Sequence, residues 1–222
     1  DLASYMQQIL TKTMPQIAQE NLAERVDIYI ENGFYDLSLA REYFKKAADL
    51  GLKMTAHCEQ LSEYGGTDLA LSFAPQSVDH VVYINEHTQQ RIADSNAVAV
   101  LLPGSDFYLR MRYPPARDLI KRGACVALST DFNPGTSPTQ DLSLIGVLAR
   151  LEMKMSLPEV IVAFTLGGAH ALGLQNEVGS LSAGKAADFS VFKGSWREFF
   201  YSVGHHPICA VYRDGEKIVD LQ

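Results

Sequence analysis

The chain has 222 residues, of which 47% are hydrophobic and 20% are charged, and its formal net charge is −7. This is the composition of an ordinary globular protein, with room for one large domain or two small ones. No basic block or stripe is present, so we expect no nucleic-acid partner. The longest apolar runs fall far short of the ~20 residues that a membrane-spanning helix needs, so we expect no membrane partner.

Helical and extended segments alternate along the chain. A helical periodicity over 3–22 precedes RVDIYIE at 25–31, whose alternating pattern predicts a strand. Asp36 is then the expected N-cap of a helix that reaches Leu50, and Gly51 ends that helix.

The same cycle repeats further along the chain. More strands are predicted at 52–58, 77–83, 97–103 and 124–130, and more helices near 66–74, 86–95, 116–122, 141–154 and 157–173. Strand–helix units at this spacing favour parallel strands joined by helical crossovers. The sequence therefore predicts an α/β fold with five parallel strands, whereas a closed (β/α)8 barrel needs eight strands and typically ~250 residues.

Three of these strands end on side chains that can bind metals. His57 lies at the end of the strand 52–58, His80 lies in the next strand, and Asp131 directly follows the last one. Ligands of parallel α/β folds bind at the carboxyl ends of the strands, so we expect these side chains to converge. Imidazole and carboxylate groups are the ligands of catalytic zinc or iron sites that keep one position open for water.

Each of these residues also has an ordinary structural explanation. A histidine at a strand end is more often hydrogen-bonded than metal-bound, His80 alone fits a core histidine, and Asp131 alone fits a residue that caps its own turn. Their repetition at strand ends is what favours a shared site. The other histidines show no such placement and have expected structural or surface roles: His87, His170, His205 and His206.

The three cysteines are widely spaced and odd in number, so we expect free thiols in a reducing cytoplasm. Cys58 follows His57 directly and should therefore point to the opposite face of its strand. We interpret Cys58 as a packing residue.

Several segments together resemble the imidazolonepropionases, a family of the amidohydrolase superfamily that acts in histidine degradation. The resemblance rests on TAHCEQ (55–60) with Gly65-Gly66, VDH (78–80), LLPG (101–104) and STDFNPGT (129–136), of which the last is the most specific. VGSLSAGKAADF (178–189) resembles the run by which amidohydrolases leave the barrel for a small β-sandwich. YRDGEK (212–217) resembles the last hairpin of that sandwich, and Asp-Gly is itself a type I′ turn signal.

The resemblance implies a partial amidohydrolase-type (β/α)8 TIM barrel plus C-terminal strands of a small β-sandwich. Residues 1–177 would form the C-terminal part of the metal-dependent barrel, and residues 178–222 would form the return strands of the sandwich domain. For the complete enzyme it implies a homodimer in the cytoplasm with a small-molecule substrate.

The implied reaction is the metal-dependent hydrolysis of a cyclic amide, 4-imidazolone-5-propanoate, to N-formimidoyl-L-glutamate. One divalent metal, zinc or iron, would be bound by His57 and Asp131. Asp131 would also carry the water proton to the leaving nitrogen, and His80 would polarise the ring carbonyl or stabilise the developing oxyanion.

The resemblance assigns the substrate contacts to two segments. Gln60 matches a substrate-contacting position three residues after His57, where either Gln or Glu could hydrogen-bond the ring. Asn133, Gly135 and Thr136 match the substrate-binding turn, in which Gly135 would let the backbone approach without a Cβ in the way.

The chain departs from the family pattern in two respects. It lacks the Arg, Tyr and His by which the earlier half of the family's enzymes holds the substrate's carboxylate. The family carries a His-x-His pair at the end of its first barrel strand, and no such pair occurs here, since His205 and His206 are adjacent. The chain also begins at Asp1 rather than Met and leads directly into a helix. We therefore expect the C-terminal part of an enzyme, which alone binds metal weakly, leaves sheet edges open and has no activity.

Two alternatives stay open. One is another activity of the superfamily, such as deamination of a ring amine, which the DFNPGT run disfavours. The other is a non-catalytic remnant that kept the scaffold and lost the metal, which metal analysis would distinguish.

Overall fold

The computed structural model describes residues 1–204 and 207–221 and divides the chain into two compact units. The first unit comprises Asp1–Val100 and Asp118–Cys125, and the second comprises Leu101–Arg117 and the chain from Val126 onward. His205 and His206, for which we predicted structural or surface roles, lie outside the described residues. No described helix has both the length and the apolar character needed to cross a membrane.

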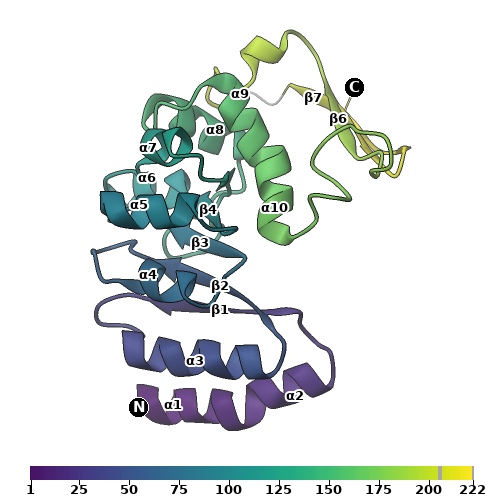
Figure 1. Cartoon of the computed structure of the whole chain (residues 1–222). Helices are drawn as coiled ribbons and strands as arrows, with labels where there is room; N and C mark the ends of the chain where they lie inside the picture. The colour runs from purple at the N-terminus through teal and green to yellow at the C-terminus, as the bar shows by residue number, and fades with distance from the viewer. Residues whose placement is uncertain (205–206, 222) are drawn as a thin grey trace. The chain divides into compact units, whose positions relative to one another are not determined.

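Two sheets are formed (Figure 1). The larger is a parallel sheet with the strand order β1-β2-β3-β4-β5, and the smaller is an antiparallel sheet with the order β6-β7-β8. The expected α/β class with five parallel strands is therefore confirmed. The predicted domain division after residue 177 stays a prediction.

The first unit is a series of strands that are each followed by a helix. Its elements are α1 (Leu2–Gln8), a π-helical turn (Ile9–Thr13), α2 (Met14–Gln19), β1 (Arg25–Ile30), α3 (Leu37–Asp49), β2 (Lys53–Cys58), α4 (Gly66–Leu71), β3 (Ser77–His80) and α5 (Glu86–Ala93). Two further elements contribute residues to both units: β4 (Val98–Leu101) and α7 (Ala116–Lys121).

Helix α3 illustrates how local chemistry sets an element. Asp36 is its N-cap, as expected, and its carboxylate accepts hydrogen bonds of 2.9 Å from the backbone of Ser38 and Leu39. Its buried residues recur at helical spacing: Ala40, Tyr43, Phe44 and Ala47. Helix α3 thereby packs on β1 and β2 on one side and meets α1 on the other (Figure 1).

The register between β1, β2 and β3 decides which side chains share a face. Tyr29 of β1 lies opposite His57 of β2, and His57 lies opposite Asp79 of β3. Cys58, one residue further along β2, is fully buried and a free thiol, which confirms its prediction as a packing residue.

Four strands end earlier than predicted: β1 ends at Ile30 rather than residue 31, β5 ends at Leu128 rather than residue 130, and β3 and β4 also end early. Strand β3 ends at His80 rather than residue 83, because His80 and Val81 have φ angles of +71° and +45°, which no strand accommodates. Strand β4 ends at Leu101 rather than residue 103, because Pro103 begins a helix, α6 (Pro103–Leu109), that the sequence analysis missed. A proline at the first helical position fits this start.

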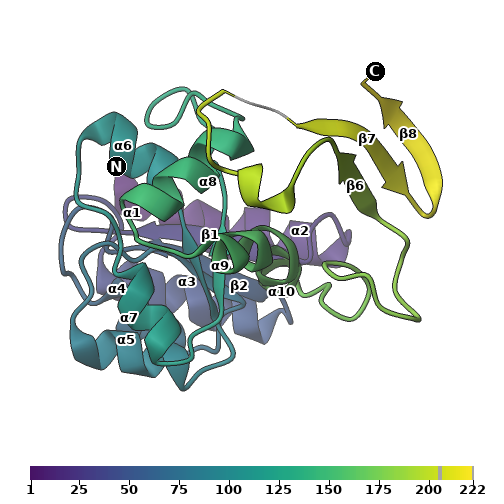
Figure 2. The ribbon, with the colours of Figure 1, turned by 90° about the horizontal axis from the view of Figure 1, so that it is seen from above.

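The second unit contains α6 and the remaining elements. They are β5 (Val126–Leu128), α8 (Leu142–Leu151), α9 (Leu157–Val162), a π-helical turn (Ala163–Gly167), α10 (Gly168–Leu172), β6 (Phe189–Phe192), a 3-10 turn (Trp196–Glu198), β7 (Ile208–Arg213) and β8 (Glu216–Asp220). A tight turn joins β7 to β8 (Figure 2). Its residues Asp214 and Gly215 have φ angles of +51° and +80°. Two positive φ angles are the signature of the predicted type I′ turn.

Helix α6 begins close to the turn that follows β5. A Cβ atom on Gly104 would lie 2.7 Å from Cδ1 of Ile145 and 3.0 Å from the Ser137 hydroxyl, so only glycine fits this approach without a shift. Two residues later, the Asp106 side chain is 1% exposed, and both of its carboxylate oxygens lack a hydrogen-bond partner among the described residues. Burial, together with the negative charge of Asp131, raises the pKa of Asp106 to about 8.

This buried acid gives a prediction about stability. A carboxyl group in an unfolded chain has a pKa of about 3.9, so the unfolded chain loses its proton near pH 4 while folded Asp106 keeps it up to about pH 8. Through this group, the free energy of unfolding should fall by at most about 1.4 kcal/mol per pH unit as pH rises over that interval.

The side chain of the variant Asp106→Asn does not titrate, so the free energy of unfolding of this variant should not fall through this group as pH rises. We expect the variant to be more stable than the wild type at pH 8, by at most about 5 kcal/mol, and similar to it at pH 4. Urea titrations of both proteins at both pH values measure the difference. Parallel pH profiles for the two proteins would mean that Asp106 is already ionised in the folded state.

Candidate active site

His57 stands near the C-terminal end of β2, next to a carboxylate supplied by β1. Its Nδ1 atom lies 3.0 and 2.9 Å from the two carboxylate oxygens of Asp27. The Thr55 hydroxyl also donates to Asp27, at 2.8 Å. Burial acts to raise the pKa of Asp27, but the hydrogen bonds from His57 and Thr55 and the charge of His57 outweigh it and lower that pKa. Asp27 is therefore a carboxylate at neutral pH.

His80 follows from β3 and comes close to His57. The centroids of the two rings are 5.4 Å apart, so the sequence prediction that these histidines share one end of the sheet is confirmed. His80 is 3% exposed, and its Nδ1 has no hydrogen-bond partner within the described part of the chain. Burial, with the charge of His57, lowers the pKa of His80 to about 3, so its imidazole is neutral at pH 7.

The backbone at His80 is strained. A φ angle of +71° puts this residue in the left-handed region, at a cost of about 1–3 kcal/mol. Such strain persists where the surrounding structure requires a particular side-chain direction, which is common at functional sites. The positive φ angle ends β3, so the direction of the His80 ring no longer follows the alternation of side chains along the strand.

Gln60 lies in the loop after β2, and a buried glutamate holds the far end of that loop. The Glu59 carboxylate accepts hydrogen bonds from the backbone of Gly65, Gly66 and Thr67 at 2.6–2.7 Å, and from the Thr67 hydroxyl. Burial raises the pKa of Glu59, against the opposing effect of these hydrogen bonds. Glu59 thus ties the loop to the start of α4.

A second buried glutamate holds the near end of the same loop. Glu31 is 1% exposed and accepts a hydrogen bond from the backbone of Leu61 at 2.8 Å, and others from the backbone and hydroxyl of Ser62. Gln60 itself is 6% exposed, and its amide oxygen accepts a 3.0 Å hydrogen bond from the Tyr29 hydroxyl. The Tyr29 hydroxyl thereby fixes the orientation of the Gln60 amide.

Asp131 and the turn after it belong to the second unit. Asp131 has a φ angle of +53°, again in the left-handed region. The Asn133 side chain organises the turn, because its oxygen accepts from the backbone of Gly135 at 2.9 Å and of Thr136 at 2.7 Å. Its amide nitrogen donates to the carbonyl of Asp131 at 2.7 Å. Asn133 therefore fixes the backbone on which Asp131 stands.

Gly135 has no packing requirement within the chain. A Cβ atom there would touch only the Asn133 side-chain oxygen, at an ordinary 3.4 Å. The sequence interpretation of Gly135, close approach of a substrate to its backbone, stays a prediction. The same holds for the substrate roles of Gln60, Asn133 and Thr136.

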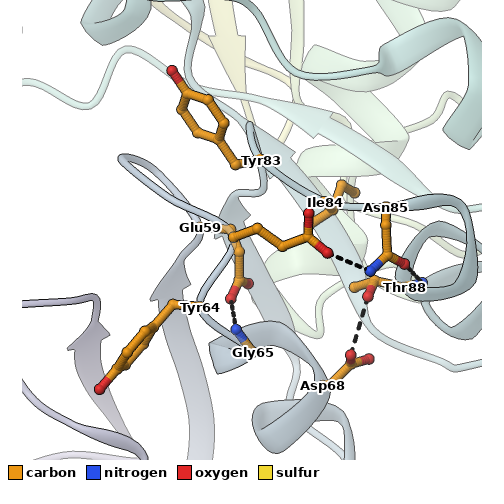
Figure 3. Close-up of a pocket in the computed structure, with 9 residues that line it drawn as sticks. Glu59, Tyr64, Gly65, Asp68, Tyr83, Ile84, Asn85 and Thr88 are labelled. Atoms are coloured by element: carbon orange, nitrogen blue, oxygen red, sulfur yellow. Dashed lines mark hydrogen bonds between the residues drawn. The ribbon is translucent and has the colours of Figure 1, made fainter.

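A pocket of about 240 Å³ opens beside this loop in the first unit (Figure 3). Its walls include the acids Glu59, Glu63 and Asp68, of which Glu63 accepts a hydrogen bond from Asn85 and Asp68 from Thr88. Figure 3 shows the Glu59 carboxylate directed at Gly65 in its wall. None of the predicted site residues lines this pocket.

The sequence analysis missed several residues that shape the site. Asp27, Tyr29 and Glu31 occupy alternate positions of RVDIYIE, between apolar residues, and were counted only as part of a strand pattern. Asp79 was noted only as the neighbour of His80, yet its carboxylate lies 3.9 Å from Nε2 of His57. The available signal was three polar residues in succession on one face of a predicted strand.

Comparison with known proteins agrees with this arrangement. The model of the amidohydrolase family matches residues 12–217. The imidazolonepropionase of Bdellovibrio bacteriovorus is 47% identical over 96% of this chain, and that of Bacillus velezensis is 36% identical over 96% of this chain. Each match covers 51% of the relative, so the chain spans about half the length of these curated proteins.

Solved structures show the same fold at low sequence identity. An adenosine deaminase from Xanthomonas campestris with bound zinc gives a TM-score of 0.76 at 19% identity, over 89% of this chain and 52% of that one. An atrazine chlorohydrolase from Arthrobacter aurescens complexed with zinc gives 0.75 at 16% identity, over 97% and 56%. The parallel sheet, its strand-end histidines and the family match lead to one conclusion: the chain belongs to the amidohydrolase family and is a homologue of the imidazolonepropionases.

Proposed function

We propose that this chain supplies part of the active site for the hydrolysis of 4-imidazolone-5-propanoate to N-formimidoyl-L-glutamate. The observation that carries the proposal is 47% identity to an imidazolonepropionase over 96% of this chain. The buried His80, the anchored Gln60 loop and the Asn133 turn support it, since each holds a polar group in a fixed position. Because the chain spans about half of such relatives, the remaining site residues would come from outside it.

The donor set fits a divalent metal, zinc or iron. His57, His80 and Asp131 offer the imidazole and carboxylate ligand atoms that such metals take. We assign His57 and Asp131 as ligands, because a metal-binding histidine commonly donates its other N–H to a carboxylate, as His57 does to Asp27. A bound cation of this kind supplies Lewis acidity that lowers the pKa of a coordinated water from ~15.7 toward ~7.

The remaining chemistry falls to side chains of this chain. Asp131 accepts the proton of the attacking water and returns it to the ring nitrogen as the carbon–nitrogen bond breaks. His80, neutral at pH 7, donates an N–H to the carbonyl oxygen, where negative charge develops. Gln60, with its oxygen engaged by Tyr29, donates its amide N–H to the substrate ring.

The substrate would meet the Asn133 turn. Asn133 and Thr136 present small polar groups, and Gly135 exposes backbone without a side chain. The likeness to a solved adenosine deaminase is a likeness of fold at 19% identity and favours no ring-amine chemistry here.

The test uses this chain assembled with the complementary half of a full-length relative, and it follows imidazolone consumption. We expect turnover and one bound metal per assembly, and no turnover by this chain alone. An assembly that carries stoichiometric metal but leaves the imidazolone unchanged would disprove the proposed function.

In that assembly, His57→Ala should abolish bound metal and turnover together, because a ligand is lost. Elemental analysis and the imidazolone assay measure the two quantities. His87→Ala is the matched control, since His87 lies at the start of α5, and it should keep both. Stoichiometric metal in His57→Ala would rule out His57 as a ligand.

Gln60→Leu should raise KM about tenfold, the effect of losing one hydrogen bond worth about 1.4 kcal/mol. Tyr29→Phe should raise KM by a smaller factor, because the Gln60 amide remains but can rotate. Steady-state kinetics of the assembly give both values, with Leu61→Ala as a control for disturbance of the loop. An unchanged KM in Gln60→Leu would remove Gln60 from the substrate contacts.

A further inference from the structure

Strand β1 carries a carboxylate that touches the proposed metal ligand and has no assigned role. Asp27 lies opposite Thr55 in the register of β1 and β2, two residues before Tyr29, which lies opposite His57. Its side chain therefore reaches along the face it shares with His57, and both of its oxygens approach Nδ1 at 2.9–3.0 Å. This contact joins residues that are 30 positions apart in the sequence.

The chemistry of the contact fixes the proton on the imidazole. A carboxylate has only acceptor atoms, so Nδ1 of His57 must be the donor in this hydrogen bond. An imidazole binds a metal only after it has lost one of its two ring protons. With the remaining proton held on Nδ1 by Asp27, the lone pair is on Nε2. A metal binds an imidazole through a nitrogen lone pair, so the contact selects Nε2 as the ligand atom.

Asp27 is itself held in place. Thr55 lies two residues before His57, on the same face of β2, and its hydroxyl donates to Asp27 at 2.8 Å. Thr55 also approaches the carbonyl of Val26 at 3.4 Å. Asp79 lies 3.9 Å from Nε2 of His57, so the contact of Asp27 with Nδ1, at 2.9–3.0 Å, is the shorter of the two.

We propose that Asp27 is a positioning residue, which holds His57 in the Nδ1–H tautomer and directs Nε2 to the metal. The proposal rests on the proposed function for the metal itself. The control of the His57 tautomer by Asp27 needs no metal, because it depends only on contacts within the first unit.

The first test reads the tautomer without any metal. Nitrogen-15 NMR of the side chains in the metal-free 222-residue chain distinguishes a protonated Nδ1 from a protonated Nε2. At a pH high enough to leave the imidazole neutral, His57 should show Nδ1–H in the wild type, lose that preference in Asp27→Ala, and keep it in Asp27→Asn, whose amide oxygen still accepts. An unchanged Nδ1–H signal in Asp27→Ala would overturn the proposal.

The second test measures zinc affinity of the same chain by competition with a chromophoric chelator. Loss of a partner that orients a ligand typically costs 10–100-fold in metal affinity, so Asp27→Ala should weaken zinc binding by about that factor. Asp27→Asn should lose less. Glu24→Gln is the matched control. Glu24 directly precedes β1 and its side chain is exposed, so this variant removes one negative charge without removing a contact to His57.

The outcomes separate this inference from the proposed function. Equal weakening by Glu24→Gln and Asp27→Ala would mean a general charge effect and would overturn the positioning role. Asp27→Asn that binds as poorly as Asp27→Ala, with the tautomer intact, would make Asp27 a ligand and also overturn it. A wild-type chain that alone binds too little zinc to measure leaves the proposed function standing, because its other ligands would come from outside the chain, and the NMR result then decides the role of Asp27.

Discussion

The parallel register of β1, β2 and β3 is the constraint on which the arrangement of the first unit depends. The register is set by buried apolar residues, with Ile28 opposite Ala56 and Ala56 opposite Val78. Since side chains alternate along a strand, a shift of one residue would turn every side chain to the other face. The apolar ladder thus forces Asp27 and His57 onto a common face without contributing any chemistry itself.

Buried polar groups in the chain fall into two kinds with opposite physical consequences. Glu31 and Glu59 are buried carboxylates whose oxygens accept several backbone hydrogen bonds, so the cost of removing their charge from water is offset. They hold the loop after β2 in one conformation. Asp106 and the Nδ1 of His80 are buried without such partners in the described structure, and their pKa values shift toward the neutral form instead.

The two kinds of group have different roles in a site: one fixes the conformation of a loop, and the other can interact with a ligand. Groups that are fully hydrogen-bonded give a loop one conformation, which is what a substrate contact such as Gln60 requires. Groups that lack partners keep donor or acceptor capacity in a water-poor environment, where an interaction with a ligand is stronger than in water. His80 combines such a nitrogen with a strained backbone, a pairing typical of functional residues.

The sequence by itself determined the elements whose signals are local. Strand periodicity predicted all five parallel strands, Asp36 marked the start of α3, and Asp214-Gly215 marked the last hairpin. His57 and Asp131 could be selected because strand ends are visible in the sequence. Only the tertiary structure decided the early end of β3 and the helix after Leu101, because a positive φ at His80 is held by packing and Leu102-Pro103-Gly104 reads locally as a turn. It alone decided the partner of His57, since the pairing of Asp27 with a residue 30 positions away depends on strand register, which no local pattern contains.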